Sequence, residues 1–468
     1  MSLSLYNTLT GRVEPLAPLD PPRVRLYVCG LTVYSRGHVG NYRTFVAVDL
    51  LRRVLRYQGY QVTHVMNITD VDDRIIALAA EAGRDLAAFT APHIQSFRED
   101  MATLRNQTPE IVPRATDHVA DMVRLIQSLQ ARGHTYDVEG SVYFRISTFP
   151  EYGRLSRLDV SGIKAGARVD TDKYDKENAR DFALWKAKAG EPEWAQWDAP
   201  FGRGRPGWHI ECSAMSMRYL GETFDLHAGG VDLIFPHHEN EIAQSVCGTG
   251  KPFVRHWVHV DHLLIENETM SKSKGNVFTI PELIEKGHKP DAIRYLLLTA
   301  HYRTQLNFTW EGLKQAAAAL QRVQGLLQRL GEVDRDGPVA PELQACLDRA
   351  RDTFDRALSD DLNTPEALAA VHVMVGEVNA LLAGGTVTRA GADAARAQVE
   401  AMDAVLGVFV PAGEEDRLSA EEQELLDERQ DARKRRDFAR ADQARRKLEE
   451  MGIILEDTPK GTRWRRVR

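Results

Sequence analysis

The pattern that most constrains the fold is a strand–helix–strand unit near the N-terminus. Residues 23–28 (RVRLYV) are typical of a short β-strand, and residues 40–57 place apolar side chains at helical spacing with arginines opposite. Gly59 ends this helical pattern, and a second strand is predicted at residues 61–68. Such a unit almost always has parallel strands and a right-handed crossover, so we expect an α/β fold built on a parallel sheet.

The strand pattern resumes at residues 223–227 and 257–265, after a polar, Gly- and Pro-bearing stretch over 114–206. We interpret that stretch as an insertion between two halves of one nucleotide-binding, Rossmann-like sheet. After residue 311 the chain becomes Ala-, Leu- and Arg-rich with helical spacing, and Thr364-Pro365-Glu366 is a plausible N-cap and first turn of a long helix.

Three regions are therefore expected. A catalytic α/β domain covers residues 1–311, with the insertion at 114–206 and a junction segment at 266–311. An α-helical bundle covers 312–410, and a small C-terminal module covers 411–468 after the linker PAGEE. A chain of 468 residues has room for about three domains.

Composition indicates a soluble globular protein, with 43% apolar and 27% charged residues. Arg12 and Glu14 interrupt the N-terminal stretch where a signal peptide needs an apolar run, and we find no 18-residue apolar segment. We expect a cytoplasmic protein with no membrane association. The four cysteines are too few and too scattered for a disulfide framework, so reduced thiols or metal ligands are the better interpretations.

Charge is unevenly distributed along the chain. The net charge of −7 argues against indiscriminate nucleic-acid binding. Residues 427–468 nevertheless hold 14 Lys and Arg against 9 Asp and Glu, which makes this end the candidate contact for a polyanion. A solvated helix with internal ion pairs explains the same charges equally well.

The loop between Cys29 and Asn41 follows the first strand, at the edge where open α/β sheets bind ligands. It ends in His38-Val39-Gly40-Asn41. A helix beginning near Gly40 presents unpaired N–H groups to an anion, His38 can donate to phosphate oxygens, and Gly40 allows close approach of a nucleotide. Taken alone, these four residues are a weak signal, and an ordinary surface loop is the better interpretation of them.

Two further segments complete a predicted ATP site. Residues 269–276 (TMSKSKGN) form a basic loop after a strand, and Lys272 could swing onto a polyphosphate. Residues 227–232 (HAGGVD) end another strand, where Gly230 and Asp232 suit a ribose hydroxyl. A solvated basic loop is the alternative for the first segment. Three such features at successive strand ends are more specific than any one alone.

Four dispersed residues, Cys29, Cys212, His237 and Glu241, are candidate metal ligands. Pro236 can open a helix on which His237 and Glu241, four residues apart, share a face, while Cys212 lies on another predicted helix. Thiolate, imidazole and carboxylate are all zinc ligands. The sequence holds no C-x-x-C pair, so a buried structural cysteine beside a polar helix remains open as an alternative.

The motifs together resemble the cysteinyl-tRNA synthetases, a family of class I aminoacyl-tRNA synthetases. The resemblance is carried in order by YVCGLTVYSRGHVGN, NITDVDD, DFALWK, GRPGWHIECSAM, LHAGGVDLIFPHHENEIAQS and TMSKSKGN. It extends through DDLNTPEAL in the helical region to LEDTPKGTRWR near the end, and so covers nearly the whole chain.

This resemblance implies roles for single residues. Thr69 and Trp208 match positions that line the cysteine pocket, and Gly230 and Asp232 match the ribose-facing strand end. Lys272 matches the second lysine of the KMSKS motif. The family's zinc ligands are matched by Cys29, Cys212, His237 and Glu241, and the first and last positions of its HIGH motif by His38 and Asn41.

Two departures from the family pattern affect the phosphate contacts. Asn41 stands where the HIGH motif has its second His, and an amide can still hydrogen-bond to phosphate. Thr269 stands where KMSKS has its first Lys, which removes one cation from the loop.

The activity implied is activation of L-cysteine by Mg²⁺-ATP to cysteinyl-adenylate, followed by transfer to tRNA(Cys). We expect a monomer with one Zn²⁺ that recognises the substrate thiol. Two alternatives from other classes remain. One is a ligase that joins cysteine to an amino sugar, as in the mycothiol pathway, although a small acceptor needs neither the helical nor the basic region. The other is a non-enzymatic zinc- and RNA-binding protein, for which the changes at Asn41 and Thr269 are the only support.

Overall fold

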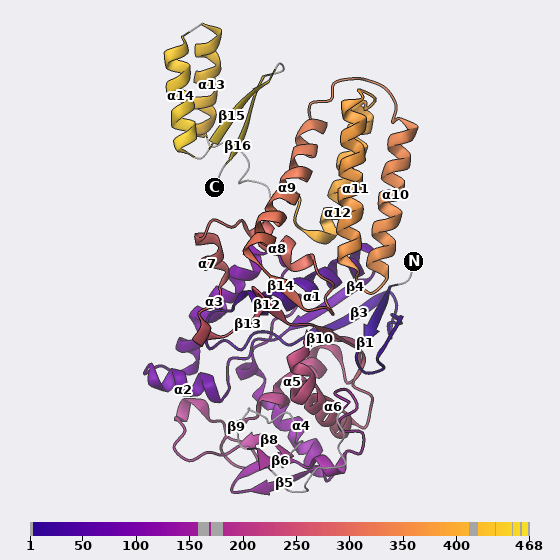
Figure 1. The fold of residues 1–468 in the computed structure, drawn as a ribbon. Coiled ribbons are helices and arrows are strands. Elements are labelled where there is room, and N and C mark those ends of the chain that lie inside the picture. The colour runs from indigo at the N-terminus through magenta and orange to yellow at the C-terminus, as the bar shows by residue number, and fades with distance from the viewer. Residues whose placement is uncertain are drawn as a thin grey trace. The chain divides into compact units, whose positions relative to one another are not determined.

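A computed structural model describes residues 3–157, 168–169, 181–410, 420–435, 437–451, 453–458 and 461–466. The chain forms two compact units, residues 1–407 and 408–468. Figure 1 shows their elements, and each unit is described by itself.

A four-stranded sheet forms the centre of the first unit. Its members are β3 (Arg23–Val28), β4 (Gln61–Met66), β10 (Phe224–Gly230) and β11 (Val254–Val260). The strands lie in the order β11-β10-β3-β4 and every neighbouring pair is parallel. The expected parallel α/β fold is confirmed, and the predicted first strand has the observed bounds.

The order of the strands reverses between β3 and β10. From β3 the chain passes through α1 (Val39–Tyr57) to β4 on one side, and from β10 through α6 (Glu239–Thr249) to β11 on the other. The loops after β3 and β10 therefore diverge and leave a crevice beyond their carboxyl ends. This is where ligands bind in open α/β sheets.

Helices cover the sheet on both faces (Figure 1). Helix α1 packs on β4, β10 and β11, whereas α5 (Trp208–Leu220) packs on β3 and β4 together with α4 (Val119–Ala131) and α6. The central strands are buried on both sides: β10 has seven buried residues in succession. Burial on both faces is what helices on the two sides of a parallel sheet produce.

The 114–206 insertion contains a sheet of its own, which the sequence did not predict. Its strands run β5-β6-β8-β7, with β9 paired to β8. All six residues of β8 are buried, and Phe144 stacks on Phe182 with ring centroids 5.1 Å apart. The bounds are β5 (Thr135–Val138), β6 (Ser141–Phe144), β7 (Arg168–Val169), β8 (Asp181–Lys186) and β9 (Arg205–Pro206).

The prediction of a single strand over residues 257–265 is wrong. The structure divides it into β11 and β12 (Leu263–Ile265), because the chain turns at Asp261 and His262 to join a second sheet. There the Asp261 N–H donates to the carbonyl of Tyr302, and the His262 carbonyl accepts from Leu306. The other strands of this sheet are β13 (Glu268–Thr269) and β14 (Leu306–Phe308).

Four long helices follow: α9 (Trp310–Leu330), α10 (Pro341–Ser359), α11 (Thr364–Ala383) and α12 (Arg389–Leu406). Asn363, and not Thr364, caps α11, accepting the Glu366 N–H at 3.2 Å. Among the described helices, α11 alone is long and apolar enough to pass a composition test for a membrane span. It packs against α9, α10 and α12, as a bundle helix does.

The remaining elements of the first unit are shorter or lie at its edge. They are β1 (Ser4–Asn7), β2 (Arg12–Pro15), α2 (Asp73–Glu81), α3 (Leu86–Thr103), α7 (Ile280–Glu285) and α8 (Pro290–Leu298).

The second unit has a helical hairpin and a β-hairpin. They comprise α13 (Ala420–Lys434), α14 (Phe438–Glu450), β15 (Ile453–Thr458) and β16 (Gly461–Arg466). Its small core consists of Leu426, Leu448, Ile453 and Leu455.

Candidate active site

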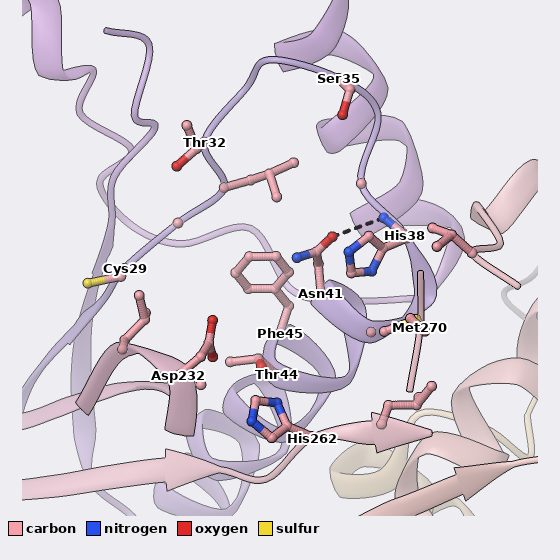
Figure 2. Close-up of a pocket in the computed structure, with 18 of the residues that line it drawn as sticks. Cys29, Thr32, Ser35, His38, Asn41, Thr44, Phe45, Asp232, His262 and Met270 are labelled. Atoms are coloured by element: carbon pink, nitrogen blue, oxygen red, sulfur yellow. Dashed lines mark hydrogen bonds between the residues drawn. The ribbon is translucent and has the colours of Figure 1, made fainter. Parts of the chain in front are cut away.

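A cavity of about 780 Å³ lies at the carboxyl ends of β3, β10 and β11. Its size and position suit a small-molecule site. Ten of the predicted site residues line it: Cys29, His38, Gly40, Asn41, Thr69, Trp208, Cys212, Gly230, Asp232 and His237. Figure 2 shows several of them, with His38, Asn41 and Met270 gathered on one side of the cavity and Cys29 and Asp232 on the other.

The HVGN turn is held by its own side chains. His38 is the N-cap of α1 in extended conformation, and its N–H donates to Asn41 Oδ1 at 3.0 Å (Figure 2). The amide of Asn41 thus closes the first turn, a role that its carbonyl oxygen serves well. The expectation that this end of the helix is unpaired is partly wrong, because the Val39 N–H donates to the Phe278 carbonyl at 2.8 Å.

Glycine at position 40 lets the side chain of Met270 lie close to the backbone, and the approach of a nucleotide to Gly40 stays a prediction. A Cβ atom at this position would lie 2.2 Å from Met270 Cε, the methionine of TMSKS. The loop after β13 therefore packs directly on the HVGN turn. The contact atom is the end of a flexible side chain, which can shift at little cost.

Hydrogen bonds within the loop hold the TMSKS segment, which follows β13. The Ser271 N–H donates to Asn276 Oδ1 at 2.8 Å, and residues 272–274 form a 3₁₀ turn. Lys274 Nζ lies 3.0 Å from Glu268 Oε2 in an exposed ion pair. The side chain of Lys272 lies outside the described residues, so its predicted phosphate contact stays a prediction.

The four candidate metal ligands converge. Cys29 directly follows β3, Cys212 lies on α5, and Glu241 lies on α6, with His237 just before that helix. The ligand atoms of all four lie within 4.8 Å of one another, and all four side chains are buried. Cys29 Sγ is 3.6 Å from both Cys212 Sγ and Glu241 Oε1, and His237 Nε2 is 3.1 Å from Glu241 Oε1. Two sulfurs, one nitrogen and one carboxylate suit a zinc-like cation.

One helix does not carry both His237 and Glu241, contrary to the expectation. Helix α6 begins at Glu239, and His237 belongs to a preceding five-residue π-helical turn, Ile234–His238. Phe235 is extended inside that turn, with φ −134° and ψ 132°. The turn nevertheless brings the imidazole over the carboxylate.

A second, overlapping set of ligands was missed by the sequence. Cys29 and Glu241 also lie within 4.8 Å of His227 and His238. His227 Nε2 is 3.0 Å from Glu241 Oε2, and His238 Nε2 is 3.4 Å from Cys29 Sγ. The doubled histidine in FPHHENE and the histidine ending LH in β10 were visible signals. Nothing local, however, indicates that they share ligands with Cys29.

Burial and mutual contact shift the ionisation of this cluster. Burial raises the pKa of Cys29, and its hydrogen bond to Cys212 raises it further. Burial also opposes ionisation of Cys212, but the hydrogen bonds from Cys29 and His237 lower its pKa overall. Burial lowers the pKa of His237, yet Cys212 and Glu241 outweigh it and raise the value. The cluster thus favours a thiolate and a carboxylate stabilised by a nearby cation.

Trp208 and Thr69 frame the cavity beside the cluster. Trp208 opens α5 one turn before Cys212, and its ring lies 4.5 Å from that of His237. Thr69 Oγ1 accepts from Asn67 Nδ2 at 3.1 Å. Asn67 Oδ1 in turn accepts from the Gly30 N–H at 3.0 Å, which ties together the ends of the neighbouring parallel strands β3 and β4.

Gly230 and Asp232 lie together at the end of β10. A Cβ atom on Gly230 would lie 2.3 Å from Asp232 Oδ1, so glycine lets the carboxylate fold back over the strand end. Both residues line the cavity, and Figure 2 shows Asp232 pointing into it.

Comparison with known proteins identifies the family. Residues 15–318 match tRNA synthetases class I (C) catalytic domain, 353–410 match the DALR domain, and 415–465 match the cysteinyl-tRNA ligase anticodon binding domain. The cysteine–tRNA ligase of Solibacter usitatus is 49% identical over 472 residues, and that of Koribacter versatilis is 46% identical over 504 residues. Both alignments cover 100% of each chain. The chain belongs to the cysteine–tRNA ligase family.

Solved structures confirm the fold of this cysteine–tRNA ligase family member. Methionyl-tRNA synthetase from Mycobacterium tuberculosis with methionyl-adenylate aligns with a TM-score of 0.59 at 18% identity, covering 83% of this chain and 90% of that one. A LeuRS–tRNA complex from Agrobacterium radiobacter aligns with a TM-score of 0.61 at 12% identity, covering 84% and 85%. At these identities the likeness shows a shared class I synthetase fold.

Proposed function

We propose that this family member activates L-cysteine with Mg²⁺-ATP in the cavity at the sheet edge and transfers the cysteinyl group to tRNA(Cys). The observation that carries the proposal is a sulfur-rich cluster and a nucleotide-type helix start opening into one cavity. Its chemistry is that of a cysteine–tRNA ligase, as the family membership indicates. Neither the mycothiol-type ligase nor the non-enzymatic alternative is favoured.

Zinc is the metal that fits the cluster, and Cys29, Cys212, His237 and Glu241 are the ligands that we propose. Three of these four line the cavity, whereas neither His227 nor His238 does. When bound, Zn²⁺ supplies a soft centre that a substrate thiol ligates as a thiolate far more readily than a serine hydroxyl does. Packing alone rejects such an isostere only ~100-fold, so recognition of sulfur is needed where no editing occurs.

The chain's own residues then position the reaction. Trp208 and Thr69 hold the amino acid beside the cluster, and Gly230 and Asp232 receive the ribose. His38, Asn41 and the start of α1 face the phosphates of ATP. Lys272, on the TMSKS loop, contacts the same phosphates. The cysteine carboxylate attacks the α-phosphorus and pyrophosphate leaves, so the rate depends on alignment and on stabilising the charge that develops.

The remaining regions serve the tRNA. We propose the division 1–311 for the catalytic domain, 312–410 for the bundle and 411–468 for the module that binds the anticodon region. The last assignment is supported by the match of residues 415–465 to an anticodon binding domain and by the excess of Lys and Arg over 427–468. We further propose that the protein is a monomer in the cytoplasm.

Metal analysis of two variants tests the ligand assignment. Cys212→Ser should lose most of the bound zinc, because it removes a soft ligand from the proposed set. His238→Gln removes a ligand only from the overlapping set and should retain close to one zinc per chain. Full zinc in Cys212→Ser together with loss in His238→Gln would transfer the site to the set with His227 and His238.

Two assays on the zinc-loaded protein test the activity. Cysteine-dependent ATP–pyrophosphate exchange should proceed without tRNA, and serine should not replace cysteine. Charging of tRNA(Cys) should follow in the same preparation. Exchange without charging would favour a small-molecule ligase, and absence of both would contradict the proposed function.

A further inference from the structure

Arg36 is the one lysine or arginine that lines the cavity among the residues whose side chains the structure describes. The cavity wall also carries Asp232, Asp261 and Glu282, so the described surface is rich in acid for a site that receives a triphosphate. Phosphoryl-transfer sites supply fixed cations because the reaction develops charge on the phosphate oxygens. Thr269 leaves the TMSKS loop without a cation at its first position.

The guanidinium of Arg36 is held in place by a buried carboxylate. Its Nε and Nη2 donate to the two oxygens of Asp100 at 3.0 and 2.6 Å, in a bidentate pair. Asp100 lies on α3 and is 1% exposed, and Tyr42 Oη, from the second turn of α1, donates to it at 2.9 Å. The carboxylate therefore fixes the arginine relative to α1, the helix that begins at the HVGN turn.

The other edge of the same guanidinium remains available. Nη1 makes no hydrogen bond to any residue that the structure describes, and the Arg36 side chain is 35% exposed. Asp100 binds the Nε–Nη2 edge of the guanidinium, so the edge that carries Nη1 is already oriented before any ligand arrives. A donor fixed in this way loses little conformational freedom on binding, and the planar fork matches phosphate oxygens.

The position along the loop selects the part of the nucleotide. Arg36 lies two residues before His38, and Figure 2 places its neighbour Ser35 on the His38 side of the cavity, away from Cys29. In the proposed binding mode, the cysteine substrate and the α-phosphate that it attacks lie toward Cys29. Arg36 follows Ser35 directly and leads into the HVGN turn, so its backbone lies on the side to which the departing phosphates extend in that binding mode.

We propose that Arg36 binds the β- and γ-phosphates of ATP, the part released as pyrophosphate, and supplies the fixed positive charge that Thr269 does not. This inference rests on the proposed ATP site. Asp100 is a positioning residue that holds the guanidinium in the binding orientation.

Pyrophosphate exchange by Arg36→Gln in the absence of tRNA tests the proposal. The KM for ATP and for inorganic pyrophosphate should rise about 10- to 100-fold, the effect of losing a hydrogen bond to a charged group. The KM for cysteine and the zinc content should stay unchanged. Arg36→Lys, which keeps the charge but loses the fork, should fall between the wild type and Arg36→Gln.

A sulfamoyl analogue of cysteinyl-adenylate separates phosphate binding from a purely structural role, because it lacks the β- and γ-phosphates. Its affinity, measured by calorimetry, should be the same for Arg36→Gln and the wild type. Arg74→Gln is the matched control. Arg74, on α2, stacks 3.9 Å over the ring of Tyr34, which belongs to the same loop as Arg36, but Arg74 does not line the cavity. The KM values of Arg74→Gln should therefore match those of the wild type.

Three outcomes would overturn the inference. Equal losses of affinity for ATP and for the analogue would mean that Arg36 only orders the loop. A normal KM for ATP with a raised KM for tRNA in charging would assign the arginine to the tRNA acceptor end. Normal kinetics throughout would remove any role. Failure of the wild type to exchange pyrophosphate would instead contradict the proposed function itself, and thermal unfolding of each variant verifies that it is folded.

Discussion

His64 offers a sharp test of how burial controls stability in the catalytic unit. It lies on β4, is 2% exposed, and neither ring nitrogen has a hydrogen-bond partner among the described residues. Burial, together with the positive charge of Arg52, lowers its pKa to about 3. The folded protein therefore keeps this imidazole neutral, whereas the unfolded chain protonates it near the ordinary value of about 6.5.

The sign and size of the effect follow from proton linkage. Below pH 6.5 the unfolded state binds a proton that the folded state does not, so stability is full above that pH and falls progressively as the pH drops toward the folded pKa. One such group costs about 1.4 kcal/mol at pH 5.5 and less than ~0.1 kcal/mol at pH 7.5. Any folded value below about 4.5 gives nearly the same result, so the prediction does not depend on the depth of the shift.

His64→Leu removes the titrating group and replaces it with an apolar side chain of similar size. Urea unfolding of both proteins at pH 7.5 and 5.5 gives the difference in their free energies of unfolding. That difference should move by about 1.3 kcal/mol in favour of the variant at the lower pH. Other buried histidines titrate in both proteins and cancel.

His93→Leu is the matched control, because His93 is only partly buried. Burial lowers the pKa of His93 as it does that of His64, but no neighbouring charge contributes. The difference in free energy of unfolding between His93→Leu and the wild type should change less between pH 7.5 and pH 5.5. A His64→Leu difference that stays constant with pH would show that water reaches the ring, and would refute the argument from burial.

Four further changes test other parts of the structure. Arg294→Met removes a fully buried guanidinium that pairs with Asp49 and donates to the carbonyls of Leu104 and Leu406. Asp49 keeps its ion pair with Arg53, but the loss of these bonds should still destabilise the first unit by about 3–5 kcal/mol in urea unfolding; a loss under 1 kcal/mol would mean that the Arg294 bonds add little net stability. Gly30→Ala places a Cβ 1.7 Å from the Asn67 carbonyl oxygen, so the melting temperature and zinc content should both fall, and a normal protein would contradict this close contact between the ends of β3 and β4. Lys272→Ala should slow adenylate formation ~10²–10³-fold with the zinc content unchanged. An unchanged rate of pyrophosphate exchange would show that another cation binds the phosphates. Deletion after residue 411 should spare cysteine activation, cripple charging and flatten the salt dependence of tRNA affinity; parallel loss of both activities would make the segment structural.

The sequence by itself determined the elements whose signals are local. The observed bounds of β3 are those predicted, and α1 begins one residue before the predicted start. Both follow from side-chain periodicity and from Gly59, which act within a few residues. The motifs were equally local, and their order along the chain was enough to indicate the family.

Only the tertiary structure decided which of these elements meet. Cys29 and Cys212 are 183 residues apart in sequence and 3.6 Å apart between sulfurs, and the same fold adds His227 and His238 to their surroundings. The bond from Val39 to Phe278 and the pair of Arg36 with Asp100 are likewise invisible to periodicity. A side-chain pattern specifies which face of an element is buried, whereas the identity of the partner depends on strand order, register and the packing of the whole sheet.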